Sequence, residues 1–442
     1  MRKSRGAPRG SKKAPGPAGP RLPGGRLPLL RDAKESDQAD LMLRKLEICS
    51  KIYSFDGYVN MEEERQKKNK TETLHELREA VQTIPQLLRE PVIKNMMTMI
   101  EINVFRPLPR PVPGVGGEND DDTFHDPQYE HVSLVHDLFV NFLESQAFHP
   151  NTMKKYVDAS FITQLLGLLN SHDEREREIV KTVLHRIYGK FLGLRGFIRK
   201  SINNIFLEFA YEDDSFNGVG ELLEILGSII NGFAVPIKAE HKLFLSKVLI
   251  PLHKSPRYTS FQPHLSYCIV QFVEKESAST MLVVGSMLRV WPITNTSKEI
   301  MFLSEIEEIL DVCEPHEFLN ICEPLFQRLA LCMKSQHFQV AERALYYWNN
   351  EYVVSLIEEN IRMVMPIVFM SLYEAAKTHW SATIVMLVCN VLKTMMEMDQ
   401  ELFDNLAQML MDDKNEPMNA QQTVLDAMNR AETMNNLSNP PM

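Results

Sequence analysis

The sequence predicts an all-α protein built as a solenoid of two-helix repeats, and two observations carry this prediction. Apolar residues recur at the i, i+3, i+4, i+7 spacing of an amphipathic helix in segment after segment, with no sustained alternation of period two. Pairs of helical segments also begin at regular intervals, 35 to 46 residues apart. A two-helix unit of about 40–47 residues is the period of HEAT and armadillo solenoids, whose units bury their apolar faces against one another.

Composition agrees with a folded protein. The chain has 442 residues, 44% of them hydrophobic and 24% charged, with a formal net charge of −10. These values exclude a wholly disordered chain, a collagen-like chain and a small disulfide scaffold. Length alone would allow about three domains of roughly 150 residues. The regular spacing of the helix pairs instead favours one continuous solenoid over residues 32–411.

The first segment, residues 1–31, is expected to be a disordered basic arm. It holds nine Lys or Arg, six Pro, six Gly and no acid, so the other 411 residues carry a net charge of −19. A segment of this composition cannot bury enough apolar surface to offset its ordering entropy. It is either a solvated tail or a signal for nuclear entry or for an anionic surface.

A second irregular stretch, from Arg106 to Pro127, contains five prolines and an acidic run at residues 118–122. It predicts a long acidic surface loop at about 107–127. The last segment, residues 412–442, is rich in Asn, Met and Pro and is expected to be a poorly ordered tail.

Between the loop and the tail, the predicted helix pairs begin near residues 132, 173, 216, 262, 297, 337 and 379. Asn151 and Asp173 are predicted helix N-caps. Five prolines are predicted to lie at helix starts or in turns. They are Pro236, Pro256, Pro263, Pro292 and Pro315. One predicted helical stripe runs without a break from Ala341 to Tyr352.

Six scattered cysteines form no C-x-x-C pair and no zinc-ligand spacing, which predicts reduced core thiols in an intracellular protein. No apolar run reaches the roughly 18 residues of a membrane span, and no signal peptide is expected. The predicted location is cytoplasmic and possibly nuclear. No catalytic motif, cofactor site or metal site is predicted, because no phosphate loop, nucleophile elbow or metal-binding helix motif occurs.

One segment reverses the negative charge of the body. Residues 179–207 carry six Lys or Arg and no acid. On a helical wheel Leu184 and Ile187 belong to the packing stripe, whereas His185 and Arg186 fall on the open side. The pattern predicts either an ordinary solvated basic face or a groove for a short peptide with aliphatic anchors and a carboxylate or phosphate.

The residues that such a groove would use come from two neighbouring repeats. They are Thr182, His185, Arg186, Tyr188 and Arg195 from one, and Ile225, Ile229, Lys238 and His241 from the next. A second aromatic stretch, residues 336–350, contains Trp348, which is expected in the core. It also contains Tyr346, Tyr347, Asn349 and Asn350, which fit an interface or packing equally well.

Four runs of sequence identify a family: residues 181–195, 221–234, 305–312 and 336–350. Together they resemble the B-prime regulatory subunits of protein phosphatase 2A over roughly residues 27–410. The resemblance implies a HEAT-like solenoid of about eight repeats with no catalysis of its own. It also implies a heterotrimer with the phosphatase scaffold and catalytic subunits.

The resemblance further implies that substrates are chosen through a short linear motif, Leu-x-x-Ile-x-Glu, in disordered acidic or phosphorylated partners. By position, the nine groove residues match the family's motif pocket. Lys238 and His241 match the groups near the motif's acidic end, and Arg195 matches the basic residue beyond.

Two other classes of function remain open. A transport adaptor of the importin kind would also be an acidic solenoid, but its groove should be acidic, opposite in sign to residues 179–207. A nucleic-acid-binding solenoid would use the same basic segment and the basic arm. The net charge of −19 over the body would repel a polyanion elsewhere, so no nucleic acid is expected as a partner.

Overall fold

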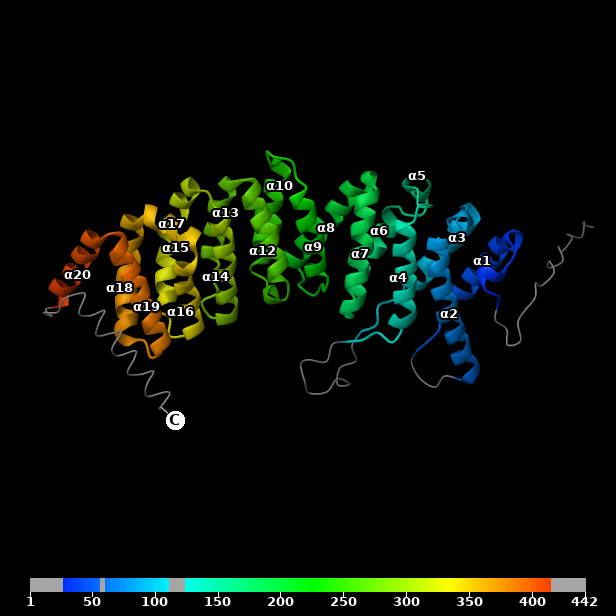
Figure 1. Ribbon diagram of the computed structural model, residues 1–442, viewed down its shortest axis with the longest axis horizontal. Helices are drawn as coiled ribbons and strands as arrows, with labels where there is room; N and C mark the ends of the chain where they lie inside the picture. The colour runs from blue at the N-terminus through cyan, green and yellow to red at the C-terminus, as the bar shows by residue number, and fades with distance from the viewer. Residues whose placement is uncertain (1–26, 56–59, 111–123, 415–442) are drawn as a thin grey trace, which may run out of the picture. The chain divides into compact units, whose positions relative to one another are not determined.

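A computed structural model of the chain describes residues 27–55, 60–110 and 124–414 (Figure 1). These residues are largely helical, and none of them lies in a β-strand. The chain divides into two compact units, residues 1–198 (unit 1) and 199–442 (unit 2). The boundary between the units falls inside α8, Arg195–Tyr211. The prediction of an all-α fold is confirmed.

In unit 1 the long helices pack on one another in chain order. Helix α2 packs against α4 and α4 against α7, while α1 packs against α3 and α6 against α7. The α-helices of this unit are α1 (Glu35–Cys49), α2 (Met61–Thr83), α3 (Glu90–Val104), α4 (Tyr129–Glu144), α5 (Pro150–Met153), α6 (Ala159–Leu168) and α7 (Glu174–Lys190). Short 3-10 turns cover Leu30–Asp32, Pro85–Leu87 and Leu192–Leu194.

In unit 2 the helices form two layers. Helices α9, α12, α14, α16 and α19 pack in sequence in one layer, and α13, α15, α18 and α20 in the other. The helices are α9 (Val219–Asn231), α10 (Ala239–Phe244), α11 (Ile250–Leu252), α12 (Tyr258–Lys275), α13 (Thr280–Arg289), α14 (Thr296–Asp311), α15 (Pro315–Met333), α16 (Phe338–Leu345), α17 (Glu351–Glu359), α18 (Ile361–Thr378), α19 (Ala382–Met398) and α20 (Gln400–Lys414). Figure 1 shows the hairpins of this unit following one another from α9 to α20.

The repeat predicted from spacing is the repeat observed. The seven predicted starts lie within four residues of α4, α7, α9, α12, α14, α16 and α19. The pair α2–α3 precedes them, so the prediction of a HEAT-like solenoid with about eight two-helix repeats is confirmed. Within each unit, the first helix of a pair packs on the first helix of the next pair, which buries the apolar stripe of one repeat against its neighbour.

Local boundary signals were less reliable than the period. Asp173 is the N-cap of α7, and its side chain accepts a hydrogen bond from the Arg175 amide, as predicted. Asn151 is not a cap, because α5 begins one residue earlier at Pro150, a residue suited to the first helical position. Pro263 lies inside α12 rather than at its start. Packing of α12 against both α9 and α14 outweighs the one backbone bond that this proline removes.

The predicted continuous helix from residue 341 to 352 is wrong. Helix α16 ends at Leu345, a 3-10 turn follows over Tyr346–Asn349, and α17 begins at Glu351. The break forms because the Asn350 side chain accepts hydrogen bonds from two amides of the first turn of α17. Tyr347 is fully buried, and its hydroxyl donates to the Leu303 carbonyl at 2.6 Å. Of the two roles left open for Tyr347, packing is therefore the one observed.

The predicted loop after α3 has anchored ends. Arg106 pairs with Asp126 at 2.5 Å and with Glu176 at 2.6 Å, and all three side chains are buried. This ion-pair cluster ties the end of α3 to the start of α7. Residues 111–123, which hold the acidic run, lie outside the described residues, as do 1–26 of the basic arm and 415–442 of the tail. Leu30, counted in the arm, is buried.

Buried polar groups mark two places in the core. In unit 2 the Glu305 carboxylate accepts from His253 at 2.8 Å and from the Tyr258 hydroxyl at 2.5 Å, and neither His253 nor Glu305 has exposed side-chain surface. In unit 1 both ring nitrogens of His136 are buried without a hydrogen-bond partner among the described residues. All six cysteines are free and buried, which agrees with the prediction of reduced core thiols.

Candidate functional site

Helix α7 presents the open face that the helical wheel predicts. Its packing stripe, which includes Leu184 and Ile187, is fully buried, whereas His185 and Arg186 are exposed. Thr182 and Tyr188 are half-buried at the edges of this face. Because residues at i, i+3 and i+4 share one side of a helix, Thr182, His185 and Arg186 form a continuous polar surface on α7.

The Arg186 guanidinium already has a partner. Its Nη2 lies 3.0 Å from the Oε1 of Glu144, the last residue of α4, and both side chains are about half exposed. A carboxylate at the C-terminal end of a helix faces the negative end of the helix dipole, so Arg186 compensates an unfavourable charge. Sequence analysis missed Glu144, because it lies 42 residues before Arg186 and only the packing of α4 on α7 brings the two together.

Arg195 supports the aromatic edge of this surface. Its guanidinium stacks 5.1 Å from the centre of the Tyr188 ring and donates to the Tyr188 carbonyl at 2.9 Å and the Gly189 carbonyl at 3.2 Å. These bonds satisfy two of the last carbonyls of α7, where a cation is also favoured by the helix dipole. Arg195 therefore holds Tyr188 in place, and part of its hydrogen-bonding capacity is used within the protein.

In unit 2 the remaining predicted residues lie on the α9–α10 hairpin. Ile225 and Ile229 are buried, with 2% and 7% of their surface exposed, so they contribute packing more than open surface. Lys238 is exposed at the N-cap of α10. His241 is half-buried and stacks flat on Phe233, with ring centres 3.8 Å apart and planes inclined by 4°.

The environment of His241 favours its neutral imidazole. Partial burial lowers the pKa of His241, and the nearby cations Arg199 and Lys238 lower it further, against the opposing effect of Glu240. A neutral imidazole stacked on an aromatic ring offers an apolar face with a hydrogen-bonding edge. Phe233 lies beyond the end of α9 at Asn231, which places its ring against His241 and not in the packing stripe of that helix.

The nine predicted residues thus form two sets. Thr182, His185, Arg186 and Tyr188 lie on α7 of unit 1, and Arg195 is the first residue of α8, directly after the turn that follows α7. Ile225, Ile229, Lys238 and His241 share one helical hairpin in unit 2. The exposed members are His185, Arg186 and Lys238, which are the polar ends that an anionic ligand would contact.

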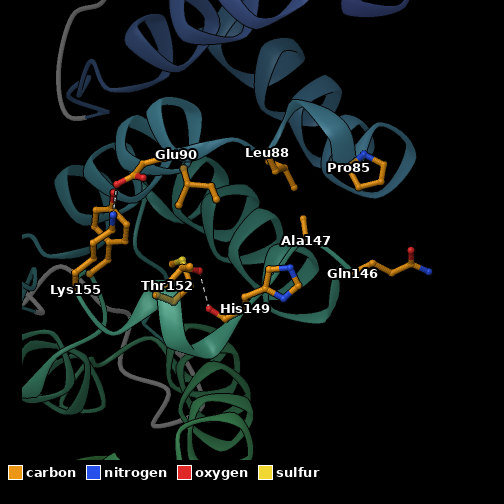
Figure 2. Close-up of a pocket in the computed structure, with 11 residues that line it drawn as sticks. Pro85, Leu88, Glu90, Gln146, Ala147, His149, Thr152 and Lys155 are labelled. Carbon is orange, nitrogen blue, oxygen red and sulfur yellow. Dashed lines mark hydrogen bonds and ion pairs between the residues drawn. The ribbon is translucent and has the colours of Figure 1, made fainter.

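Two further observations concern other kinds of site. No cluster of three or more potential metal ligands occurs in the part of the chain that the structure describes. Among the described helices, none is long and apolar enough to cross a bilayer. A pocket of about 420 Å³ does occur in unit 1, between the start of α3 and the segment from α4 to α5 (Figure 2). Nothing in the sequence pointed to it.

Comparison with known proteins places this helical repeat protein among phosphatase regulators. The profile of the protein phosphatase 2A regulatory B subunit (B56 family) matches residues 27–430. The chain belongs to this family, which confirms the resemblance to the B-prime subunits seen in its sequence.

Several curated relatives support this assignment. The chain is 51% identical over 381 residues to the mouse and human alpha isoforms of the 56 kDa regulatory subunit of serine/threonine-protein phosphatase 2A. The alignment covers 86% of this chain and 78% of each relative. A Caenorhabditis elegans regulatory subunit, pptr-1, is 49% identical, with 86% and 70% covered. These relatives are named as regulatory subunits, and the chain is a non-catalytic regulator of this class.

Solved structures give weaker similarities. Importin beta aligns with 84% of this chain and 42% of its own at 12% identity and a TM-score of 0.48. The karyopherin Kap121p, as a mutant, aligns with 90% and 38% at 13% identity and a TM-score of 0.49.

Proposed function

We propose that this chain targets substrates within the protein phosphatase 2A heterotrimer by binding short acidic motifs of the Leu-x-x-Ile-x-Glu type. It assembles with the scaffold and catalytic subunits, and the motif lies against the exposed face of α7 and the α9–α10 hairpin. The observation that carries the proposal is the pair of adjacent exposed side chains, His185 and Arg186, on a helix whose opposite face is fully buried.

The chemistry of the two sets suits such a motif. Arg186 offers a planar guanidinium to a carboxylate or phosphate, and its partner Glu144 is exposed enough to be displaced at small cost. Tyr188, held by Arg195, and the stacked pair Phe233–His241 supply aromatic surface for aliphatic side chains. Ile225 and Ile229 support the α9–α10 hairpin from within its packing, because little of either side chain is exposed.

The functional consequence is local concentration. A partner held by its motif brings a linked phosphosite to the catalytic subunit at an effective concentration of about a millimolar. The motif itself needs only modest affinity, about micromolar, since a disordered peptide must be ordered on binding. Because the cations are exposed, salt weakens the complex. We further propose that the heterotrimer acts in the cytoplasm and the nucleus.

Calorimetry with the full chain and an acidic motif peptide tests the proposal. We expect micromolar binding by the wild type, and loss of at least tenfold in affinity for Arg186→Ala or His185→Ala with unchanged helix content and heterotrimer assembly. Arg362→Ala is the matched control, since Arg362 is an exposed arginine of unit 2 that, like Arg186, forms an ion pair with a carboxylate, here that of Asp399. Undiminished affinity in the Arg186 and His185 variants contradicts the proposal.

A further inference from the structure

The pocket in Figure 2 is an open hollow with an apolar floor and a polar rim. Leu88 and Met153 line it and are buried, and Ile93 and Ala147 line it and are half-buried. The size of about 420 Å³ leaves room for a bulky aliphatic or aromatic side chain. In the close-up Ala147 lies between Leu88 and His149.

Contacts among the lining segments shape the pocket in the absence of a ligand. A Glu90–Lys155 ion pair links the start of α3 to the residues just after α5. On the other side the Thr152 hydroxyl donates to the His149 carbonyl at 2.9 Å. Phe148, between Ala147 and His149, packs edge-on against Phe142 and Phe191, with ring centres 5.4 and 5.7 Å away. A preformed pocket binds a side chain without first paying for its own ordering.

The pocket adjoins the exposed face of α7. Glu144, the partner of Arg186, is two residues before Gln146, which lines the pocket. Two consecutive Cα–Cα steps span at most about 7.6 Å. Phe191, the C-cap of α7, is in ring contact with Phe148 of the same segment. An extended peptide that leaves Arg186 therefore needs only a few residues, at about 3.3 Å each, to reach the pocket.

The charge around the pocket favours an acidic partner, as the charge on the exposed face of α7 does. The segments that line it carry three further exposed cations, Arg89, Lys94 and Lys154, next to lining residues. The one lining acid, Glu90, already pairs with Lys155. This local excess of positive charge, on a chain whose net charge is −10, favours an acidic segment.

We propose that the pocket is a second anchor site, which binds a bulky apolar side chain in the acidic sequence that flanks the motif of the same partner. The inference rests on the proposed function, since the flanking sequence reaches the pocket only when the motif lies on α7. The pocket then extends the recognised sequence beyond the motif and discriminates between partners that share the same core.

Calorimetry on the full chain tests the anchor with two sets of peptides. The first is the acidic core peptide alone. The second carries an acidic extension on either side, with a Leu or Phe placed about two, four or six residues from the core, or with Ser there instead. We expect an extension on one side only, at one spacing, to raise affinity about fivefold to tenfold over its Ser version, after the ordering cost of the added segment.

Filling the pocket should remove this gain. In Ala147→Phe the new ring fills the pocket. The peptides with an apolar residue and with Ser should then bind with the same affinity, while the affinity for the core peptide should not change. Ala159→Phe is the matched control, because Ala159 is exposed on α6 and does not line the pocket. Thr152→Phe serves as a second filling variant at an exposed lining position if Ala147→Phe folds poorly.

The outcomes separate the two proposals. Failure of the core peptide to bind the wild type overturns the proposed function and the anchor with it. Core binding without any gain from an extension overturns the anchor alone. An equal gain in wild type and both filling variants also overturns it. A photoreactive group at the apolar position should label residues 85–93 or 146–156, and labelling elsewhere contradicts the pocket as its site.

Discussion

Replacing Glu144 by Gln should strengthen motif binding. The substitution keeps the size of the side chain and removes the carboxylate that lies 3.0 Å from the Arg186 guanidinium. In the protein without peptide, Arg186 is paired with this carboxylate. An acidic peptide must displace it before Arg186 can bind a carboxylate or phosphate of the peptide. The variant therefore offers Arg186 to the peptide without a competitor.

The size of the effect follows from the exposure of the pair. Side chains that are 55% and 45% exposed form an ion pair of about 0.2–1 kcal/mol. At 1.4 kcal/mol per factor of ten, Glu144→Gln should raise affinity about 1.4-fold to fivefold. Stability should change little, because the lost ion pair is offset by relief of a negative charge at the C-terminal end of α4.

Calorimetry at low and high salt measures the prediction, and Glu130→Gln provides the control. Glu130 is also exposed and on α4, in its first turn, so the same charge change is made at the opposite end of the helix. We expect tighter binding only in the Glu144 variant, with the gain reduced at high salt. Weaker binding, or an equal change in both variants, would refute the assignment of Arg186 as the anion-binding group.

Three further predictions concern the core that supports the site. Glu305→Gln should cost about 3 kcal/mol in urea unfolding, because it leaves a buried partner unpaired. Burial alone would lower the pKa of His253, but the Glu305 carboxylate raises this pKa overall. The charged His253–Glu305 pair therefore stabilises the wild type fully below about pH 6.5, and this stability is lost as pH rises through the folded pKa. The Glu305→Gln variant should not show this loss. His136→Leu should stabilise unit 1 by about 1–2 kcal/mol, since neither ring nitrogen has a hydrogen-bond partner among the residues that the structure describes. Burial, with a smaller effect of Arg106, lowers the pKa of His136 to about 3. As pH falls from about 6.5 toward 3, the wild type should therefore lose up to about 1.4 kcal/mol of its free energy of unfolding per pH unit, and the His136→Leu variant should not show this loss. Gly227→Ala should be less stable than Gly285→Ala by about 1–3 kcal/mol in urea unfolding. The new Cβ would lie 2.6 Å from a tyrosine ring carbon at position 227, but 4.0 Å from a methionine methyl at position 285. Equal stability of the two variants would contradict this packing.

Periodicity predicted the repeat because every helix of a solenoid must bury a stripe, and a stripe leaves a regular trace in the sequence. The seven predicted starts therefore lie within four residues of the observed ones. Single capping signals were weaker guides. The break before Asn350 depends on which amides its side chain meets, and Pro263 is tolerated because neighbouring helices pack on both sides of α12.

The site shows the same division. The exposed and buried faces of α7 followed from residue spacing alone, since the helix is regular from Glu174 to Lys190. Its electrostatics did not, because Glu144 is distant in sequence and reaches Arg186 only through packing of α4 on α7. The stacking of Phe233 on His241 was hidden for a similar reason, since it depends on where α9 ends.

The most direct test of motif recognition is to locate both ends of one bound peptide on the assembled heterotrimer. A Leu-x-x-Ile-x-Glu peptide with a photoreactive group next to its leucine in one version, and next to its glutamate in another, should label the two sets of residues separately. We predict that the leucine version labels residues 182–195 and the glutamate version labels residues 238–242. Labelling of neither segment by either peptide, or no labelling that unlabelled peptide competes away, would contradict the account.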